Sequence, residues 1–333
     1  MFYLGIDVSK EKLDLCLSTE SKVLAESVLK NDMKTIKKSL SLLLKDYSIE
    51  NDKLLICAEY TGQYTYPLSC VCEESNIALW LENPTQIKYR SGIQRGKNDK
   101  LDARKIASYA CRFVEEVRLF KLPEKAIETL KQLISERDLY VVDKGKLQGQ
   151  LTDQERFMDK ALYQKKKRRF EMIIRQIDKS IAYVDKEIKR LIDNDDTLSK
   201  QHELLCSVDG IGERTAVKMI AETNAFKDFK DPRKFCCHAG VAPFSFTSGS
   251  SQRSRNKVSH RADKSIKALL HMAALVAATR MEGELNDYFV RKIAEGKNKM
   301  SVLNAVRAKL IYRMFAVIKN EKTYQKIYSN NIA

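Results

Sequence analysis

Residues 2–18 read FYLGIDVSKEKLDLCLS and decide the fold of the first part of the chain. The apolar run FYLGIDVS predicts a buried strand. After a short polar turn, Leu13, Leu15 and Leu17 alternate with other residues, which is the period of a strand. Residues 22–29 repeat this alternation. Because short turns join neighbouring antiparallel strands, the three segments predict an antiparallel meander.

The hydrophobic period changes after the meander. From Asn31 to Tyr47 apolar residues recur at helical spacing behind an Asn/Asp cap. The runs at 53–60 (KLLICAEY) and 77–81 (IALWL) predict two buried strands. Helices are expected around Gln63–Glu74 and from Asn98 onward. This order of three strands followed by alternating helices and strands predicts a mixed sheet flanked by helices.

The charge balance points to the class of partner. Lys and Arg outnumber Asp and Glu by 60 to 44, which gives the 333-residue chain a formal net charge of +16. A surplus of this size indicates a polyanionic partner, and nucleic acid is the first candidate. The apolar fraction of 44% and the charged fraction of 31% exclude a collagen, a disordered chain and a disulfide-stapled miniprotein.

Membrane and export signals are missing from the pattern. No apolar run approaches the roughly 18 to 20 residues that a membrane helix requires. The segment from Met1 to Asp7 lacks the basic part and the apolar core of a secretion signal. Most of the eight cysteines lie in apolar segments and none forms a C-x-x-C pair. We therefore expect reduced thiols, a cytoplasmic location and no membrane partner.

A different pattern begins at Pro123 and continues to about Ser199, a stretch without further proline. Its apolar residues recur at alternating spacings of three and four, at Ile174, Ile177, Ile181, Val184, Ile188 and Leu191. This is the seam of a coiled coil. An earlier apolar stripe comprises Ile127, Leu130 and Ile134. Two interpretations stay open: the stripe completes an intramolecular helical hairpin, or the arm joins a second copy of the chain.

The third region starts near Gln201 and predicts a helix, a tight turn and a second helix. Gly210 and Gly212 lie in the turn, which is typical of a helix–hairpin–helix whose backbone amides bind a phosphate, or of a plain αα-hairpin. A loop-rich stretch is expected over Asp231–Ser259, and the last helix over 304–320. The chain thus divides into three expected domains, residues 1–118, 119–200 and 201–333.

Four carboxylates fall at positions typical of a metal site. Asp7 ends the first strand and Glu59 ends the strand at 53–60, and open mixed sheets place functional groups at strand ends. Asp99 and Asp102 lie three residues apart on an expected helix and so share a face. Brought together, the four would repel one another unless a divalent ion neutralised them, and carboxylate oxygens suit Mg²⁺ or Mn²⁺. The alternative is that they are ordinary solvated carboxylates.

Basic residues gather in three segments, beside the expected carboxylates, within the arm and after a serine-rich loop. The candidates for nucleic-acid contact are Arg95, Lys97, Lys100, Lys165, Lys166, Lys167, Arg168, Arg169, Arg253, Arg255 and Lys257, together with the two turn glycines. Such clusters neutralise phosphates, although charge runs also form ordinary solvated faces.

Five motifs occur in one order along the chain. They are GIDVSK (5–10), AEYTG (58–62), KNDKLDARKIA (97–107), GIG-x-x-TA (210–216) and HAGVAP (238–243) with a following SG (248–249). In this order they resemble the insertion-sequence transposases that have an N-terminal RuvC-like DEDD domain and a C-terminal serine domain. The resemblance implies an α/β, RNase H-like mixed sheet for about residues 1–118, followed by a helical coiled-coil arm and a mainly helical C-terminal domain. It also implies that Asp7, Glu59, Asp99 and Asp102 bind the metal.

The same resemblance implies a chemistry. It places the nucleophile at Ser248, directly before Gly249 and five residues after Pro243, whereas a serine-rich loop by itself is more typical of a turn. The implied enzyme is a Mg²⁺-dependent (or Mn²⁺-dependent) DNA transposase or recombinase that forms a covalent phosphoserine intermediate. Its guide is a structured non-coding "bridge" RNA. Ala262 and Lys267 depart from the glycine and arginine common in the family, which puts the local turn in doubt.

The partners implied are double-stranded DNA of the element ends and the target, the guide RNA, and further copies of the chain, as a dimer and as a tetramer at synapsis. The implied location is the bacterial cytoplasm, at the nucleoid. Two other functions stay open. One is a hydrolytic RuvC-like junction resolvase or nuclease, in which the carboxylates activate water. The other is a non-catalytic nucleic-acid-binding protein with structural carboxylates.

Overall fold

A computed structural model describes the chain over residues 1–90, 99–244, 247–248, 252–253, 257–258 and 262–325. For residues 99, 100, 244, 247, 248, 252, 253 and 257 only the backbone is described. The chain forms two compact units, Met1–Leu122 and Pro123–Ala333. Among the helices in the described ranges, none is long and apolar enough to span a bilayer.

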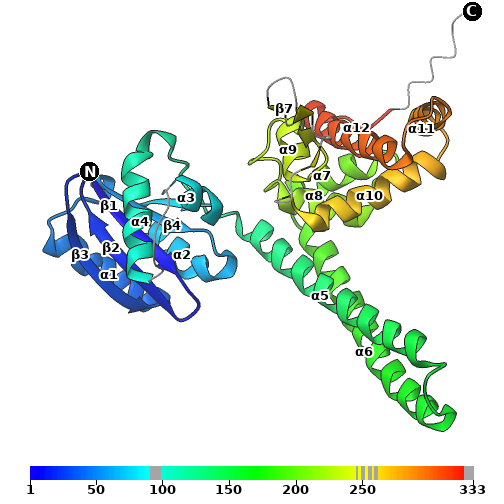
Figure 1. Cartoon of the computed structure of the whole chain (residues 1–333), viewed down its shortest axis with the longest axis horizontal. Helices are drawn as coiled ribbons and strands as arrows, with labels where there is room; N and C mark the ends of the chain where they lie inside the picture. Colours follow the sequence, from blue (N-terminus) through cyan, green and yellow to red (C-terminus); the bar gives the residue numbers. More distant parts are fainter. Residues whose placement is uncertain (91–98, 245–246, 249–251, 254–256, 259–261, 326–333) are drawn as a thin grey trace, which may run out of the picture. The chain divides into compact units, whose positions relative to one another are not determined.

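The first unit is built on a five-stranded sheet (Figure 1). Its strands are β1 (Phe2–Val8), β2 (Lys12–Ser18), β3 (Val23–Lys30), β4 (Leu54–Glu59) and β5 (Ala78–Glu82). The order is β3-β2-β1-β4-β5: the first three strands pair antiparallel, as the predicted meander, and β4 and β5 continue the sheet in parallel. This order and these directions are those of the RNase H-like fold, so the predicted fold of this part is confirmed.

Helices cover both faces of the sheet. They are α1 (Met33–Asp46), α2 (Tyr66–Glu74), α3 (Pro84–Arg90) and α4 (Asp99–Arg112), with 3₁₀ turns at Asn51–Lys53, Gly62–Thr65 and Val114–Glu116. One face packs Leu4 and Ile56 against α1 and α2, and the other packs Tyr3, Cys57 and Trp80 against α4. Three of these helices were predicted and α3 was not. The only local sign of α3 is its cap. Asn83 precedes Pro84, and the Asn83 side chain accepts a hydrogen bond of 2.9 Å from the Thr85 N–H.

Helix α4 lies against β1 (Figure 1), and at Gly5 the two backbones come close together. The contact is made by Gly5 of β1 and by Ala103 and Ala107 of α4. A Cβ atom at Gly5 would lie 2.2 Å from the Ala107 nitrogen and 2.3 Å from the Ala103 carbonyl oxygen. Only glycine therefore allows this approach, and the approach holds α4 over the strand that ends in Asp7.

We expect Gly5→Ala to destabilise the Met1–Leu122 unit by about 3 kcal/mol or more, because the added methyl group meets backbone atoms that move only with the whole helix. Chemical denaturation followed by circular dichroism measures the change. The matched control is Gly145→Ala in the second unit, where a Cβ meets nothing within 4 Å and the helix should gain about 1 kcal/mol. Equal stability of Gly5→Ala and the parent would contradict the close approach.

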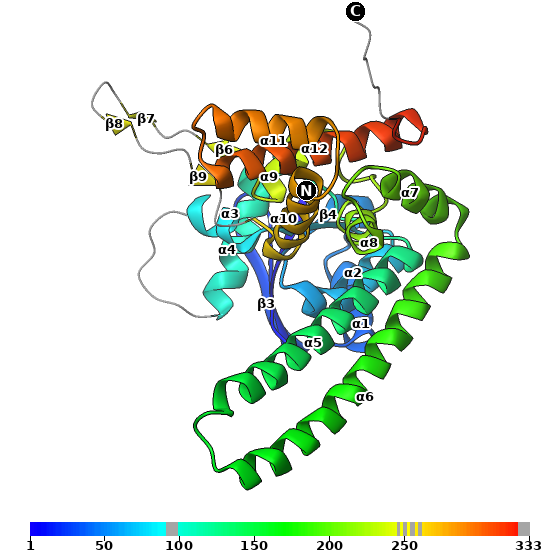
Figure 2. The same ribbon diagram turned by 90° about the vertical axis from the view of Figure 1, so that its right-hand side faces the viewer.

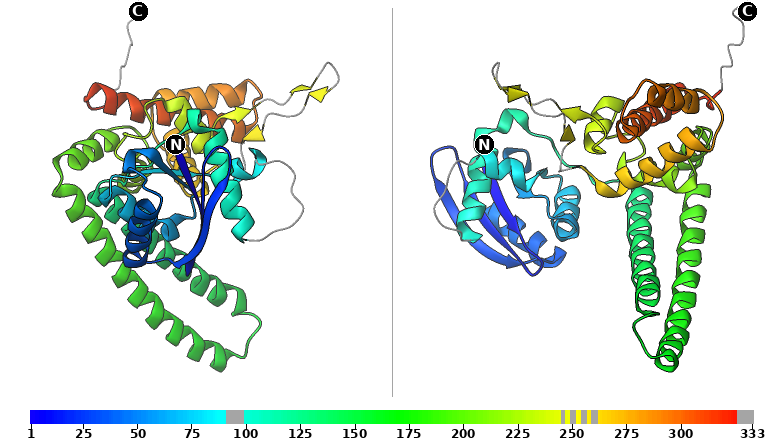
Figure 3. Two further views of the ribbon diagram at one scale, coloured as in Figure 1. Left: turned by 90° about the vertical axis from the view of Figure 1, so that its left-hand side faces the viewer. Right: turned by 45° about the vertical axis from the view of Figure 1, so that its right-hand side comes forward.

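The second unit begins with a long antiparallel hairpin of α5 (Lys125–Gln154) and α6 (Lys160–Asp193), which Figures 2 and 3 show side by side. Two ion pairs fix its register, Arg137 with Asp185 and Lys144 with Asp178, each at 2.6 Å. At the base of the hairpin, Val184 and Ile188 of the predicted seam are buried in one core with the earlier stripe. The chain thus supplies its own partner for this part of the seam.

Six shorter helices follow the hairpin. They are α7 (Asp196–Cys206), α8 (Glu213–Glu222), α9 (Pro232–His238), α10 (Lys264–Thr279), α11 (Glu284–Ala294) and α12 (Lys299–Asn320). The base of the hairpin and these helices share one hydrophobic core. The prediction of loop over Asp231–Ser259 was wrong for α9, in which Asp231 caps the first turn and Phe235 and Cys236 are buried.

The remainder of that stretch contains short antiparallel strands. They are β6 (Pro243–Phe244), β7 (Thr247–Ser248), β8 (Gln252–Arg253) and β9 (Lys257–Val258). β6 pairs with β9, and β7 pairs with β8. The described parts of residues 243–258 therefore form two short antiparallel strand pairs between α9 and α10, which we call the Ser248 ribbon.

Candidate functional site

The carboxylates predicted at the strand ends are neighbours in the sheet. Ile6 of β1 pairs with Ala58 of β4 in parallel register, so Asp7 and Glu59 follow at the same level of adjacent strands. Ile6 and Ala58 belong to the core under α1 and α2. Because side chains alternate along a strand, Asp7 and Glu59 lie on the opposite face, on the side of α4. Both are half-buried, and both have partners within the molecule.

Helix α4 brings the third described carboxylate to this face. Asp102 is half-buried and ion-paired with the Lys105 ammonium group one turn further along. Its neighbour Ala103 contacts Gly5, two residues before Asp7. Asp99 is the first residue of α4, and its side chain lies outside the described part of the chain. Three elements thus place Asp7, Glu59 and Asp102 on one face at one end of the sheet.

Two further carboxylates extend this group. Asp14 of β2 pairs in register with Asp7, is 4% exposed, and lies 3.0 Å from the Lys12 ammonium group. Glu82 of β5 pairs with Glu59 and accepts a hydrogen bond of 3.2 Å from the Tyr109 hydroxyl. Burial and the nearby Glu82 raise the pKa of Tyr109 to about 12. We name Asp14, Asp7, Glu59 and Glu82 the carboxylate row, since they cross four adjacent strands.

Sequence reasoning missed Asp14 and Glu82 because only the register between strands aligns them with Asp7 and Glu59. The donor set of the row and of Asp102 consists of oxygen atoms, which fits Mg²⁺ or Mn²⁺. Lys105 on Asp102 and Lys12 on Asp14 offset two of these carboxylate charges. Five carboxylates gathered at one end of the sheet nevertheless form an electrostatic environment that favours cations.

The candidate nucleophile lies in the ribbon of the second unit. The backbone of Ser248 belongs to β7, where it pairs with Gln252 of β8. Ser248 thus belongs to the second unit, whereas the carboxylate row belongs to the first.

Comparison with known families decides the class of the chain. Residues 202–290 match the model described as Transposase IS116/IS110/IS902 family, and residues 4–154 match the DEDD transposase model of IS110 elements. The chain belongs to the IS110 family of transposases. Membership confirms the resemblance drawn from the five motifs. It makes the protein a transposase or recombinase of insertion elements, an enzyme that cleaves and rejoins DNA strands.

Two relatives of this IS110-family chain match it along nearly its full length. The pilin gene-inverting protein of Moraxella lacunata is 25% identical over 326 residues, 97% of this chain and 98% of the relative. The same protein of Moraxella bovis is 24% identical with the same coverage. The insertion element IS116 uncharacterized 44.8 kDa protein of Streptomyces clavuligerus is 24% identical over 148 residues, which are 44% of this chain and 36% of the relative.

Among solved structures, RuvC of T. thermophilus in complex with a Holliday junction substrate is similar to part of the chain. The TM-score is 0.28 and the sequence identity 15%, over 36% of this chain and 99% of RuvC. The Thermus thermophilus RuvC structure gives the same values over 100% of its own chain.

The basic residues predicted to contact nucleic acid differ in their exposure along the arm. Lys165, Arg168 and Arg169 are exposed on α6 and form no ion pair with other described residues, and Lys167 is half-buried. Lys166 instead bonds Gln150 at 3.3 Å and lies over the Phe170 ring, within the hairpin.

For the other basic candidates less is described. Lys100, Arg253 and Lys257 have a described backbone only, in α4, β8 and β9. Arg95, Lys97 and Arg255 lie outside the described residues.

The glycine turn between α7 and α8 has a structural reason. Gly210 has φ +85°, and a Cβ there would lie 2.8 Å from the Ala277 Cβ and 2.9 Å from the Ala273 carbonyl oxygen of α10. Gly212 is the N-cap of α8, and a Cβ at this position would meet nothing within 4 Å. Packing against α10 therefore accounts for Gly210, and contact of this turn with phosphate stays a prediction.

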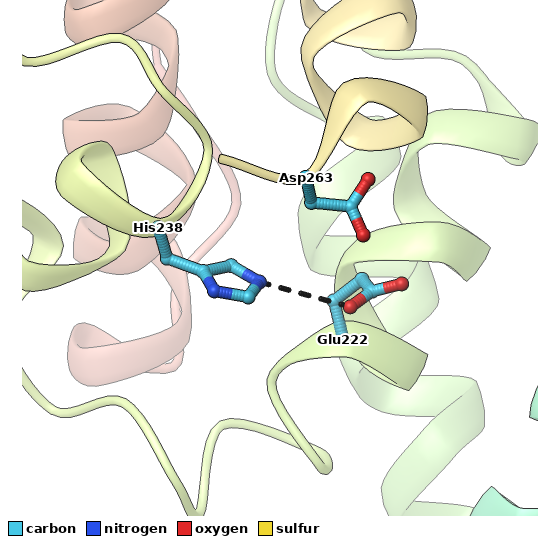
Figure 4. A group of neighbouring side chains, drawn as sticks. All are labelled: Glu222, His238 and Asp263. Carbon is cyan, nitrogen blue, oxygen red and sulfur yellow. Dashed lines mark ion pairs between the residues drawn. The ribbon is translucent and has the colours of Figure 1, made fainter. Parts of the chain in front are cut away.

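One cluster was not predicted at all. Glu222, His238 and Asp263 come from three separate elements, yet one ligand atom from each lies within 4.8 Å of the others (Figure 4). No spacing rule finds this cluster, because 41 residues of chain separate its first and last members and tertiary packing alone joins them.

Proposed function

We propose that this transposase is a Mg²⁺-dependent, RNA-guided DNA recombinase with a serine nucleophile. In the proposal Asp7, Glu59, Asp99 and Asp102 hold the metal and Ser248 attacks the DNA. The observation that carries it is the placement of Asp7 and Glu59 on adjacent strand ends, beneath the helix that bears Asp102. Family membership favours strand exchange over a purely hydrolytic resolvase.

The metal half of the proposal rests on the donor set. Asp7, Glu59 and Asp102 offer carboxylate oxygens at one sheet edge, and Asp14 lies beside Asp7 in the same row. When bound, Mg²⁺ would neutralise a DNA phosphate and stabilise the charge that develops on its oxygens. The protein's part is to hold these ligands rigid, which the backbone contact between Gly5 and α4 supports.

In the serine part of the proposal, a covalent phosphoserine intermediate preserves the energy of the phosphodiester bond. The Ser248 oxygen bonds to a DNA phosphorus, the bond to one deoxyribose oxygen breaks, and the serine proton ends on the released hydroxyl group. A hydroxyl of another strand then attacks the phosphoserine, and the proton returns to Ser248. Each step forms one P–O bond and breaks one, so no external energy source is required.

The nucleic-acid partners are supported by charge. Double-stranded DNA follows from the family, and the net charge of +16 suits a phosphate backbone. Lys165, Arg168 and Arg169 are exposed on the arm, and we assign them to the guide RNA, whose shape and backbone such residues recognise. Lys100, Arg253 and the glycine turn are proposed to contact DNA.

The oligomer is supported by exposed apolar residues on the hairpin. Leu139 and Val142 of α5 and Met172 and Tyr183 of α6 are each more than half exposed, although Val184 and Ile188 of the seam are buried. A surface of this kind favours association of arms. We propose that the arms join copies of the chain into a dimer, and into a tetramer when two DNA partners are brought together.

A factorial experiment tests the proposed function. Purified protein is incubated with a nicked DNA substrate, with or without Mg²⁺ and with or without RNA transcribed from the flank of the element. We expect a covalent protein–DNA adduct only when both are present, its loss in EDTA, and its return with Mg²⁺ or Mn²⁺. An adduct in EDTA would contradict the metal, and an adduct without RNA would contradict the guide. Cleavage without any adduct identifies the hydrolytic alternative.

A further inference from the structure

We propose that Glu222, His238 and Asp263 form a zinc site at the base of the Ser248 ribbon. This site lies in the second unit and differs from the carboxylate row of the first, and it goes beyond the proposed function. Glu222 is the last residue of α8, His238 the last residue of α9, and Asp263 the N-cap of α10. Their ligand atoms all lie within 4.8 Å of one another, and Figure 4 shows the three side chains converging.

The histidine supplies an observation independent of the clustering. The His238 side chain is 37% exposed, but its Nε2 atom is shielded from solvent and makes no hydrogen bond with the described residues. Glu222 Oε2 lies 3.8 Å from Nε2, which is within ion-pair distance but beyond hydrogen-bond distance. A buried ring nitrogen without a partner is costly, and a cation between the two atoms would use its lone pair.

The two carboxylates each keep one oxygen available. Oδ1 of Asp263 accepts the N–H groups of Ser265 and Ile266 at 2.7 and 3.0 Å, which leaves Oδ2 without a partner in the described part of the chain. Oε1 of Glu222 lies 3.0 Å from the Lys218 ammonium group, and Oε2 faces His238.

The donor set selects the metal. One imidazole nitrogen and two carboxylate oxygens suit Zn²⁺ better than Mg²⁺, and a water would fill the fourth position. The helix cap holds the Asp263 carboxylate in place, as outer contacts do for metal ligands generally. Cys236, two residues before His238, is 3% exposed within the hydrophobic core and is not among the ligand atoms that cluster here.

The site lies where the two ends of segment 239–262 meet. The Asp263 N–H donates to the His238 carbonyl oxygen at 3.1 Å, so the two ends of segment 239–262 already meet here. Gly240, with φ +62°, packs so closely that a Cβ would lie 2.4 Å from the Ala262 Cβ. Bound Zn²⁺ would clamp both ends of the segment that carries Ser248 to α8.

Cobalt titration of the full chain tests the site. Co²⁺ replaces Zn²⁺ as a visible probe, in excess Mg²⁺ to occupy the carboxylates of the first unit. We expect one Co²⁺ per chain, with the visible absorption of a four- or five-coordinate nitrogen and oxygen site, and its displacement by Zn²⁺. Zn²⁺ at about 100 times its Kd should also raise the Tm of the second unit by about 5 °C.

Conservative variants make the test specific. Glu222→Gln, His238→Gln and Asp263→Asn should each weaken binding at least about 10-fold. Asparagine still caps α10, so Asp263→Asn separates loss of the metal from loss of the fold. The matched control is Glu203→Gln, an exposed carboxylate of α7 outside the cluster, which should bind as the parent does.

Three results would overturn the zinc site. They are the absence of bound Co²⁺, unchanged binding by Glu222→Gln, and a thiolate-to-cobalt charge-transfer band that reveals cysteine ligands. Asp7→Asn should keep this site, so a failure here stays distinguishable from a failure of the proposed catalytic metal.

Discussion

Asp7→Asn is expected to lower strand cleavage and adduct formation by more than about 100-fold while the protein remains folded. Asparagine has nearly the shape of aspartate but no charge, so it binds a divalent cation poorly. Asp7 lies between Asp14 and Glu59 in the carboxylate row, where its loss removes the central ligand. Adduct yield on the nicked substrate measures the effect, with RNA binding as the test that the protein is otherwise intact.

The matched control for this variant is Asp46→Asn. Asp46 is exposed at the end of α1, on the side of the sheet away from α4, and should behave as the parent. Full recombination by Asp7→Asn would mean that the carboxylates are structural and that the protein acts by binding nucleic acid.

Ser248→Ala is expected to remove the covalent adduct entirely and to lower recombination on the order of 10⁴-fold or more, as loss of a serine nucleophile does elsewhere. The variant lacks only the attacking oxygen, so DNA and RNA binding should persist. Denaturing electrophoresis of the protein with labelled DNA detects the adduct, and mass spectrometry of the digested adduct identifies the linked residue.

Ser250→Ala is the control, because it removes a hydroxyl two residues away in the same serine-rich stretch. The nucleophile is wrongly assigned if the Ser250→Ala protein loses the adduct, or if the parent is linked through another residue. Cleavage by Ser248→Ala at the parent's rate would instead favour water as the attacking group.

Local pattern was enough to predict the sheet and the arm. Alternation in the first 30 residues and a seam of alternating three- and four-residue spacings each reflect the geometry of one element. The short helices α3 and α9 were missed, although each begins with an Asn or Asp cap followed by proline. With seven residues apiece they carry too little apolar periodicity to be recognised, and the cap is their only local signal.

The sites needed contacts that no local pattern contains. Asp7 and Glu59 were found because each ends its own strand, whereas Asp14 and Glu82 become neighbours only through strand register. His238 joins Glu222 and Asp263 only when three helices pack around a shared core. The sequence therefore predicted candidate residues that can be recognised from their place in one element. It missed residues that become neighbours only when two or more elements pack together.

The length of the hairpin of α5 and α6 can be compared with the repeat of a nucleic-acid duplex. From Lys167 near its tip to Ile192 at its base, α6 rises about 38 Å at 1.5 Å per residue. A duplex advances about 3.4 Å per base pair, so this distance corresponds to roughly eleven base pairs, about one turn. A nucleic acid bound both at the proposed basic tip and at the base of the hairpin would therefore be contacted at two points about one turn apart.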